Sequence, residues 1–207
     1  MKMQQWVQCT MWRASRRRPT ALRRGMWLLC FLLPLWFFGA AAQAGPETKP
    51  TQYEVEAAYL FNFGKFVVWP VRGPSSNSPF LICVLGDDPF GPILDRAIAG
   101  ETLKGRPVQD KRITRPQDAT GCSILYISSS ESGRLSKLLP TIHEAPVLTV
   151  SDIPDFVQQG GMIQFVLRDG RVRFEVNLAP AQRNGLTMSS ELLKVAVQVV
   201  RGAGGSH

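Results

Sequence analysis

Few residues in this chain of 207 could do acid–base, nucleophilic or metal chemistry. It has two histidines, His143 and His207, and the second is the terminal residue. No HExxH, Cys-x-x-Cys, G-x-S-x-G or Walker sequence occurs, and no second histidine is available to complete a metal site. His143 is expected at a helix C-terminus, where an imidazolium suits the helix dipole. We therefore predict that the protein is not an enzyme and that it uses neither a metal nor a cofactor.

Acidic and hydroxyl side chains instead gather where predicted buried strands end. In open α/β sheets a ligand binds beyond the carboxyl ends of the strands, and a serine run that leads into a helix could hold an anion on its amides. The alternative is that these residues are ordinary turns and helix caps, which explains each of them. The candidate ligand pocket consists of Asp87 and Asp88 after one strand, Ser128, Ser129 and Ser130 after a second, and Asp152 after a third.

Residues 161–177 (GMIQFVLRDGRVRFEVN) read as two strands joined at Asp169-Gly170, a pair suited to a tight hairpin turn. Glu175 is expected on the same strand face as Arg171 and Arg173. That position predicts a surface cross-strand charge rather than a buried acid. We therefore interpret the hairpin as scaffold or as part of an interface.

Alternation of short apolar runs with helical segments sets the fold class. Runs that are apolar throughout predict strands buried on both faces. Asp88 is expected to cap a helix that has Pro89 at its first position. Strands alternating with short helices imply a parallel sheet. We predict an α/β fold with three layers, in which a mostly parallel sheet has helices on both faces and ends in an antiparallel C-terminal hairpin. The expected strands are 80–85, 106–113, 122–128 and 146–150, and the expected helices are 89–99, 132–143, a short one from 152, and 189–201.

Residues 53–69 predict the longest helix, which ends at Pro70. Two apolar faces adjoin on it, which is more than one side of a single domain usually needs. Large aromatic residues dominate the cores of interfaces. The equal alternative is that the whole helix is core. The predicted partner interface consists of Tyr59, Phe63, Phe66 and Trp69, with Lys65 at its rim.

The N-terminal 44 residues differ from the rest. They combine a basic start, an apolar run and the sequence Ala42-Gln43-Ala44, which predicts a secretory signal peptide cleaved after Ala44. The alternative is an uncleaved membrane anchor. Seven of the 24 Lys and Arg and none of the 16 Asp and Glu precede residue 45, so the net charge falls from +8 to +1 after cleavage. The basic balance belongs to the export signal, and we predict no nucleic-acid partner.

The rest of the chain is expected to form one domain. Residues 45–52 read as a linker, 53–201 as a single α/β domain and 202–207 as a flexible tail. Two of the four cysteines, Cys83 and Cys122, lie beyond the signal. In an exported domain such a pair favours a disulfide, which would stabilise the fold by roughly 4 kcal/mol in the chain-entropy model. Two free buried thiols are the alternative.

Six sequence blocks, in order along nearly the whole domain, resemble the YfiR-type periplasmic proteins, the YfiR/HmsC-like family. This resemblance implies a small α/β periplasmic protein, often dimeric, with a disulfide between Cys83 and Cys122. It implies repression of an inner-membrane diguanylate cyclase by binding to the periplasmic sensor region of the cyclase, which lowers cyclic diguanylate and restrains biofilm formation. Some members carry a second cysteine pair near the C-terminus, and this chain has none there. The blocks are YEV…AYLFNFGKF…WP (53–70), ICVLGDDPFG (82–91), CSILYIS (122–128), VLTVSD (147–152), GGMI (160–163) and VRFEVN (172–177).

Three functions compete on these observations. The first is a non-catalytic periplasmic regulator that binds a membrane receptor, and the second is a periplasmic small-molecule sensor or carrier that uses the candidate pocket. An unrecognised hydrolase is a distant third, because no nucleophile is paired with a base. A regulator should copurify with an inner-membrane protein, whereas a carrier should bind a ligand without one.

Overall fold

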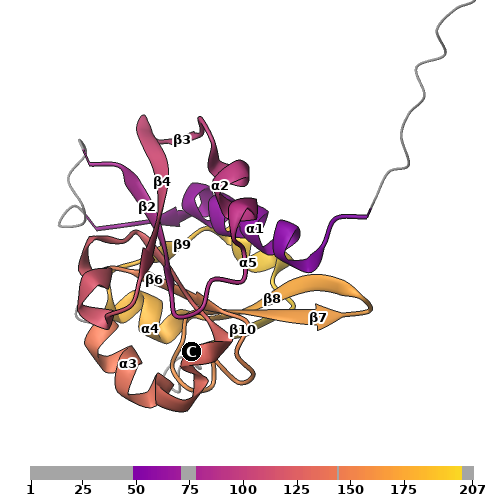
Figure 1. Ribbon diagram of the computed structural model, residues 1–207. Helices are drawn as coiled ribbons and strands as arrows, with labels where there is room; N and C mark the ends of the chain where they lie inside the picture. Colours follow the sequence, from indigo (N-terminus) through magenta and orange to yellow (C-terminus); the bar gives the residue numbers. More distant parts are fainter. Residues whose placement is uncertain (1–48, 71–77, 144, 202–207) are drawn as a thin grey trace, which may run out of the picture. The chain divides into compact units, whose positions relative to one another are not determined.

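The computed structural model describes residues 49–70, 78–143 and 145–201 (Figure 1). The predicted signal peptide, the first half of the predicted linker and the predicted tail lie outside these residues. No helix in the described ranges is long and apolar enough to cross a membrane.

The described part of the chain contains an eight-stranded sheet in the order β10-β8-β7-β6-β5-β2-β4-β3. The five central strands, β7, β6, β5, β2 and β4, are parallel to their neighbours within this group. At its two ends, β7 pairs antiparallel with β8 and β4 pairs antiparallel with β3. The chain steps from β2 to β4 on one side and then to β5, β6 and β7 on the other, which is the order of a doubly wound fold. The strands are β2 (Phe80–Leu85), β3 (Thr102–Leu103), β4 (Arg106–Ile113), β5 (Ile124–Ile127), β6 (Leu148–Ser151), β7 (Ile163–Arg168), β8 (Arg171–Asn177) and β10 (Gln198–Val200).

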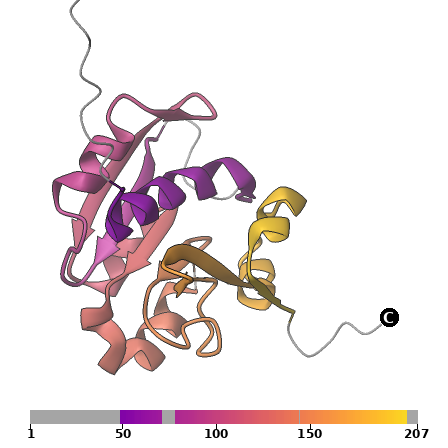
Figure 2. The same cartoon turned by 90° about the vertical axis from the view of Figure 1, so that its right-hand side faces the viewer.

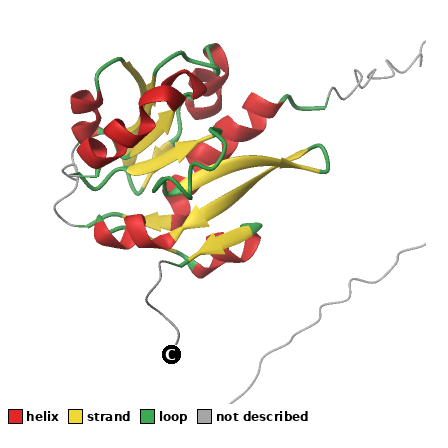
Figure 3. Cartoon of the chain, turned by 90° about the horizontal axis from the view of Figure 1, so that it is seen from below, coloured by secondary structure: helices red, strands yellow, loops and turns green. Residues whose placement is uncertain are grey.

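Helices cover both faces of this sheet, as predicted (Figures 1 and 3). Alternate residues of a strand point to opposite faces. In β2, Ile82 and Val84 therefore pack with α1 and α2, while Cys83 and Leu85 pack with α3. The result is two cores separated by one sheet. The helices are α1 (Gln52–Phe66), α2 (Pro92–Ile98), α3 (Leu135–Ile142), α4 (Leu178–Arg183) and α5 (Ser190–Val195), with 3-10 helices η1 (Pro116–Gly121) and η2 (Ser129–Arg134).

Local signals fix both ends of α1. A capping box starts the helix, because Glu54 N donates to the Thr51 side chain and Thr51 N donates to the Glu54 carboxylate. The helix ends at Phe66, three residues earlier than predicted. The β-branched pair of β1 (Val67–Val68) adopts extended backbone and pairs antiparallel with β9 (Thr187–Met188). Figure 2 shows α1 in indigo, with α5 in yellow beside one of its ends.

The predicted helix over 189–201 is wrong in its second half. The α5 helix stops at Val195, and the following residues form β10, which pairs in parallel with β8. Val197 N also donates to Phe174 O over 3.0 Å. The apolar spacing of this segment fitted a helix, but its valines suit a strand, and pairing with the backbone groups of β8 decides between the two.

Two smaller expectations about helices are also corrected. The α2 helix begins at Pro92 after Gly91, not at Pro89. The Asp88 carboxylate accepts from Phe90 N over 2.9 Å, and this bond closes a turn ahead of the helix. Residues 152–160 form turns rather than a short helix.

The predicted hairpin forms, with Asp169 and Gly170 as its two turn residues, but Glu175 is buried rather than on the surface. Only 5% of Glu175 is exposed. It lies opposite Gln164 of β7 and beside Gln198 of β10, because β8 is not an edge strand. Arg168 NH2 donates to the Glu175 carboxylate over 3.3 Å, so the buried acid has a cationic partner.

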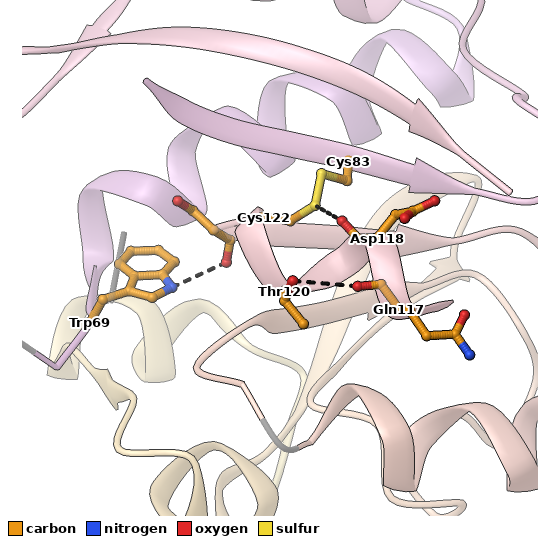
Figure 4. The surroundings of a disulfide bond; sticks show 7 residues. Trp69, Cys83, Gln117, Asp118, Thr120 and Cys122 are labelled. Carbon is orange, nitrogen blue, oxygen red and sulfur yellow. Dashed lines mark hydrogen bonds between the residues drawn. A yellow bond between two sulfur atoms is a disulfide. The ribbon is translucent and has the colours of Figure 1, made fainter. Parts of the chain in front are cut away.

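A disulfide joins Cys83 and Cys122, as predicted, with the Cα atoms 5.9 Å apart (Figure 4). It links β2 to the residue where η1 gives way to β5, and both cysteines are buried. The indole of Trp69 donates to Ser123 O over 3.1 Å, so the segment after β1 is held next to the disulfide (Figure 4).

We expect a peptide pair cross-linked through Cys83 and Cys122 in mass spectra of a non-reduced digest. Replacing both cysteines by serine should lower the free energy of unfolding by about 4 kcal/mol, because the 39-residue separation sets the loop that the disulfide closes. Reductant should lower the melting temperature of the native protein and leave that of the double variant unchanged. Two free thiols in protein isolated under oxidising conditions would contradict the assignment.

Candidate functional site

The loops after β2 and β5 border the crevice where the strand order reverses. Asp87 N donates to Ser130 Oγ over 3.0 Å, which brings the two predicted loops together. A Cβ added to Gly86, whose φ is +91°, would stand 2.5 Å from Ser130 Oγ. Only glycine fits this approach of backbone to side chain. The backbone amide of Asp87 and the side chain of Ser130, both in the predicted pocket, are therefore hydrogen-bonded to each other.

Other residues of the predicted pocket also have structural partners. Ser128 Oγ accepts from Ser130 N over 3.4 Å at the start of η2. The Asp88 carboxylate accepts from Arg112 Nε over 2.8 Å in addition to its turn bond. Ser129 is exposed. These contacts match the alternative interpretation of the sequence, in which this group forms turns and caps.

Among the predicted pocket residues, Asp152 lines a cavity. The cavity has a volume of about 370 Å³ and lies between the start of α1, the turn after β6 and the length of β7. Its size is at the lower end of the range for small-molecule sites. The residues that line it are Gln52, Glu56, Asp152, Pro154, Gln164, Phe165, Val166, Leu167 and Arg168.

Glu56 is the acid that the sequence interpretation missed. It is fully buried on α1, and its Oε1 accepts from Gln52 Nε2 over 2.8 Å. Its Oε2 has no hydrogen-bond partner among the described residues. Burial raises the pKa of Glu56 to about 7, the bond from Gln52 opposes that rise, and the charge of Asp152 adds to it. A sequence signal existed, because Glu56 precedes the buried residues Leu60 and Phe63 at helical spacing.

Two tyrosines complete this polar cluster. Tyr126 of β5 is fully buried, and its hydroxyl faces the side chain of Asp152. Burial raises the pKa of Tyr126, and the negative charges of Asp152 and Glu56 raise it further. The same three causes, in the same order, raise the pKa of Tyr53. Phe90 packs against both phenol rings, with centroid distances of 4.7 Å to Tyr126 and 5.7 Å to Tyr53. We call Tyr53, Glu56, Tyr126 and Asp152 the acidic cluster.

The predicted interface on α1 divides into core and surface. Phe63 is only 1% exposed and stacks on Phe165, so it belongs to the core. Tyr59 is half-buried against Phe165 and Phe174, and Trp69 is half-buried and bonded to Ser123.

The remaining predicted interface residues are accessible. Phe66 is 38% exposed, and Lys65 is exposed with its ammonium 4.3 Å from the ring centre of Phe61. Val68, two residues beyond Phe66, is 54% exposed. We call Lys65, Phe66 and Val68 the α1 terminal surface. A partner interface on this surface stays a prediction.

The described residues contain no group of three or more His, Cys, Asp or Glu side chains placed to hold a metal ion. His143, at the end of α3, has its pKa lowered by burial and then by the charge of Arg183. Its position at a helix C-terminus is as predicted.

Comparison with known proteins gives one family, and the similar solved structures include two distant ones. A family model described as YfiR/HmsC-like matches residues 53–197. A conserved domain protein from Vibrio cholerae O1 biovar eltor str. N16961 is 12% identical with a TM-score of 0.44, over 57% of this chain and 54% of that one. An ABC domain in complex with L-Trp from Streptococcus pneumonia is 13% identical with a TM-score of 0.44, over 58% of this chain and 55% of that one. The chain thus spans just over half of each structure, and likenesses this weak do not bear on its function.

Glu56→Gln should raise stability at alkaline pH and leave it nearly unchanged at pH 4. The pKa of Glu56 is about 7 in the folded protein and 4.5 for an ordinary glutamate. Glu56 therefore destabilises the fold increasingly as the pH rises from 4.5 to 7, and the full destabilisation is present above pH 7. Removing the charge should therefore gain roughly 3 kcal/mol at pH 8. Thermal or urea unfolding at the two pH values measures this difference. Exposed Glu101→Gln is the control, and an equal effect of Glu56→Gln at both pH values would contradict the burial of a charge.

Proposed function

Because the chain belongs to the YfiR/HmsC-like family of periplasmic regulators of cyclic diguanylate signalling, we propose that it is an exported, non-catalytic repressor of an inner-membrane diguanylate cyclase. It binds the periplasmic sensor region of the cyclase. The match of the family model to residues 53–197 carries this proposal, since it covers the fold from α1 to the end of α5. Repression lowers cyclic diguanylate and restrains biofilm formation.

Repression of this kind requires only differential binding. A regulator that binds the inactive state of a receptor more tightly than the active state shifts the receptor towards inactivity, by as much as the two affinities differ. No chemical step in the regulator is needed. The function therefore depends on a surface of the protein rather than on a catalytic set.

The α1 terminal surface combines the two exposed residues of the predicted interface, Lys65 and Phe66, with the neighbouring Val68. Phe66 and Val68 supply exposed apolar area, and Lys65 supplies charge beside it. An aromatic centre with a charged edge is the usual composition of an interface. The same surface suits either the cyclase or a second copy of this chain, and a homodimer forms part of the proposal.

A sensor or carrier of a small periplasmic molecule is the second candidate function. The observation that favours it is the cavity bordered by Glu56 and Asp152. It does not exclude the first function, because a ligand could control a regulator.

Export and repression are tested together in a bacterium that carries a candidate cyclase. The full chain should lower cellular cyclic diguanylate and biofilm mass, and the cyclase should copurify with it from detergent-solubilised membranes. The same chain without residues 1–44 should stay in the cytoplasm and leave cyclic diguanylate unchanged, since the sensor region lies on the other side of the membrane. Repression by this shortened chain would contradict periplasmic action.

Lys65→Glu combined with Phe66→Ser should weaken cyclase binding by at least tenfold, which is about 1.4 kcal/mol. Both side chains are accessible, so the melting temperature should change little. Pull-down and cyclic diguanylate measurements report the loss of binding and of repression. Lys137→Glu, an exposed charge reversal on α3, is the matched control and should repress normally. Full repression by the double variant would rule out this surface.

A further inference from the structure

Glu56 Oε2 has no hydrogen-bond partner among the described residues, whereas the nearby Tyr126 hydroxyl faces the side chain of Asp152. These three side chains come from α1, from β5 and from the turn after β6. Buried polar groups in proteins are nearly always bonded to a partner, so the unbonded oxygen of a fully buried acid needs an explanation. Glu56 and Asp152 also line the cavity, and Glu56 is fully buried.

The charges that face the cavity leave its two acids without a counter-ion. Arg168 of β7 is the one cation among the lining residues, and its guanidinium is 3.3 Å from the carboxylate of Glu175. The pKa values of Tyr53 and Tyr126 are raised, so both phenols are neutral at ordinary pH. Glu56 is held by Gln52, which is also neutral. An ionised Glu56 beside Asp152 is therefore uncompensated among the described residues that line the cavity, and such a charge is costly to bury.

We infer that this cavity binds a small organic cation, whose ammonium group is held by the carboxylates of Glu56 and Asp152. Carboxylates only accept hydrogen bonds, and an ammonium only donates them, with three N–H groups on one charge. The bond between the two is charge-assisted and stronger than one between neutral groups.

The walls of the cavity indicate the chemistry of the part of the ligand that lies beyond the ammonium group. Pro154, Phe165, Val166 and Leu167 supply apolar surface, which suits a short hydrocarbon chain. A bare divalent ion fits less well, because calcium takes six to eight oxygen ligands and this site offers two carboxylates. A volume of about 370 Å³ holds an alkyl amine or a short diamine.

Binding is expected to depend on pH through Glu56. The ammonium binds the ionised carboxylate, and the pKa of Glu56 is about 7 in the free protein. The affinity for the ammonium should therefore rise as the pH increases from 6 to 8. Well below pH 7, each further decrease of one pH unit should lower this affinity by about tenfold. Occupation should lower the pKa of Glu56 and release a proton.

Isothermal titration of the purified protein with 1,4-diaminobutane at pH 8 tests the inference. We expect saturable one-site binding that weakens by about tenfold at pH 6. Glu56→Gln and Asp152→Asn should each weaken binding at pH 8 by at least tenfold, and Glu56→Gln should also abolish the pH dependence. Neither 1,4-butanediol, which lacks charge, nor succinate, which has the opposite charge, should bind. Thermal melts verify that each variant is folded, and the Asp152 variant provides a second test if the Glu56 variant unfolds.

Three results would overturn the assignment. The first is the absence of saturable binding at millimolar diamine at pH 8, and the second is equal binding by the native protein and both folded variants. The third is binding of the diol or of succinate with an affinity similar to that of the diamine. None of these results depends on the cyclase, so this site and the proposed repression can fail separately. Glu101→Gln, exposed and away from the cavity lining, should bind as the native protein does.

Discussion

Phe63 of α1 stacks on Phe165 of β7 and meets Phe174 of β8 edge-on, with ring centroids 5.9 Å and 5.2 Å apart. Through these rings the helix is fixed in rotation over the sheet. Seven residues make nearly two helical turns, so the rotation that buries Phe63 also carries Glu56 inwards. It turns Lys65, two residues further on, to the opposite side. The rotation set by these two ring contacts therefore accounts both for the buried acid at the cavity and for the exposed side chain of Lys65.

The doubly wound order usually places a ligand where the strand order reverses. Here Asp87 N–H donates to Ser130 at that position, and the backbone at Gly86 approaches the Ser130 side chain too closely for any residue but glycine. The cavity lies further along the sheet, where Asp152 follows β6 and the start of α1 forms one wall. A site there offers carboxylates instead of free backbone amides. Anion binding, as found in other proteins with this strand order, is therefore not expected at this cavity.

The sequence predicted the features that depend on local pattern. The apolar runs of β2 and β5 alternate between two cores, and the Asp169-Gly170 turn and the disulfide needed only composition, spacing and compartment. It failed where distant pairing decides. The segment after Val195 becomes a strand because β8 offers backbone groups beside it, and that pairing also buries Glu175. The cavity was missed for the same reason, since Glu56 and Asp152 are 96 positions apart in the numbering and meet only in the folded chain.

The disulfide between Cys83 and Cys122 also affects how this fold can be reached. The two strands on either side of the order reversal, β2 and β5, pair directly, although α2, β3, β4 and η1 lie between them in the chain. Without the cross-link, their meeting requires closure of a long flexible loop, and such closures slow the formation of parallel sheets. Once oxidation has joined the cysteines, that closure is already complete and the two strands are held near their final register. In an oxidising compartment the disulfide thus removes the long loop closure from the pairing of β2 and β5. In a reducing compartment the protein would fold more slowly and would be less stable.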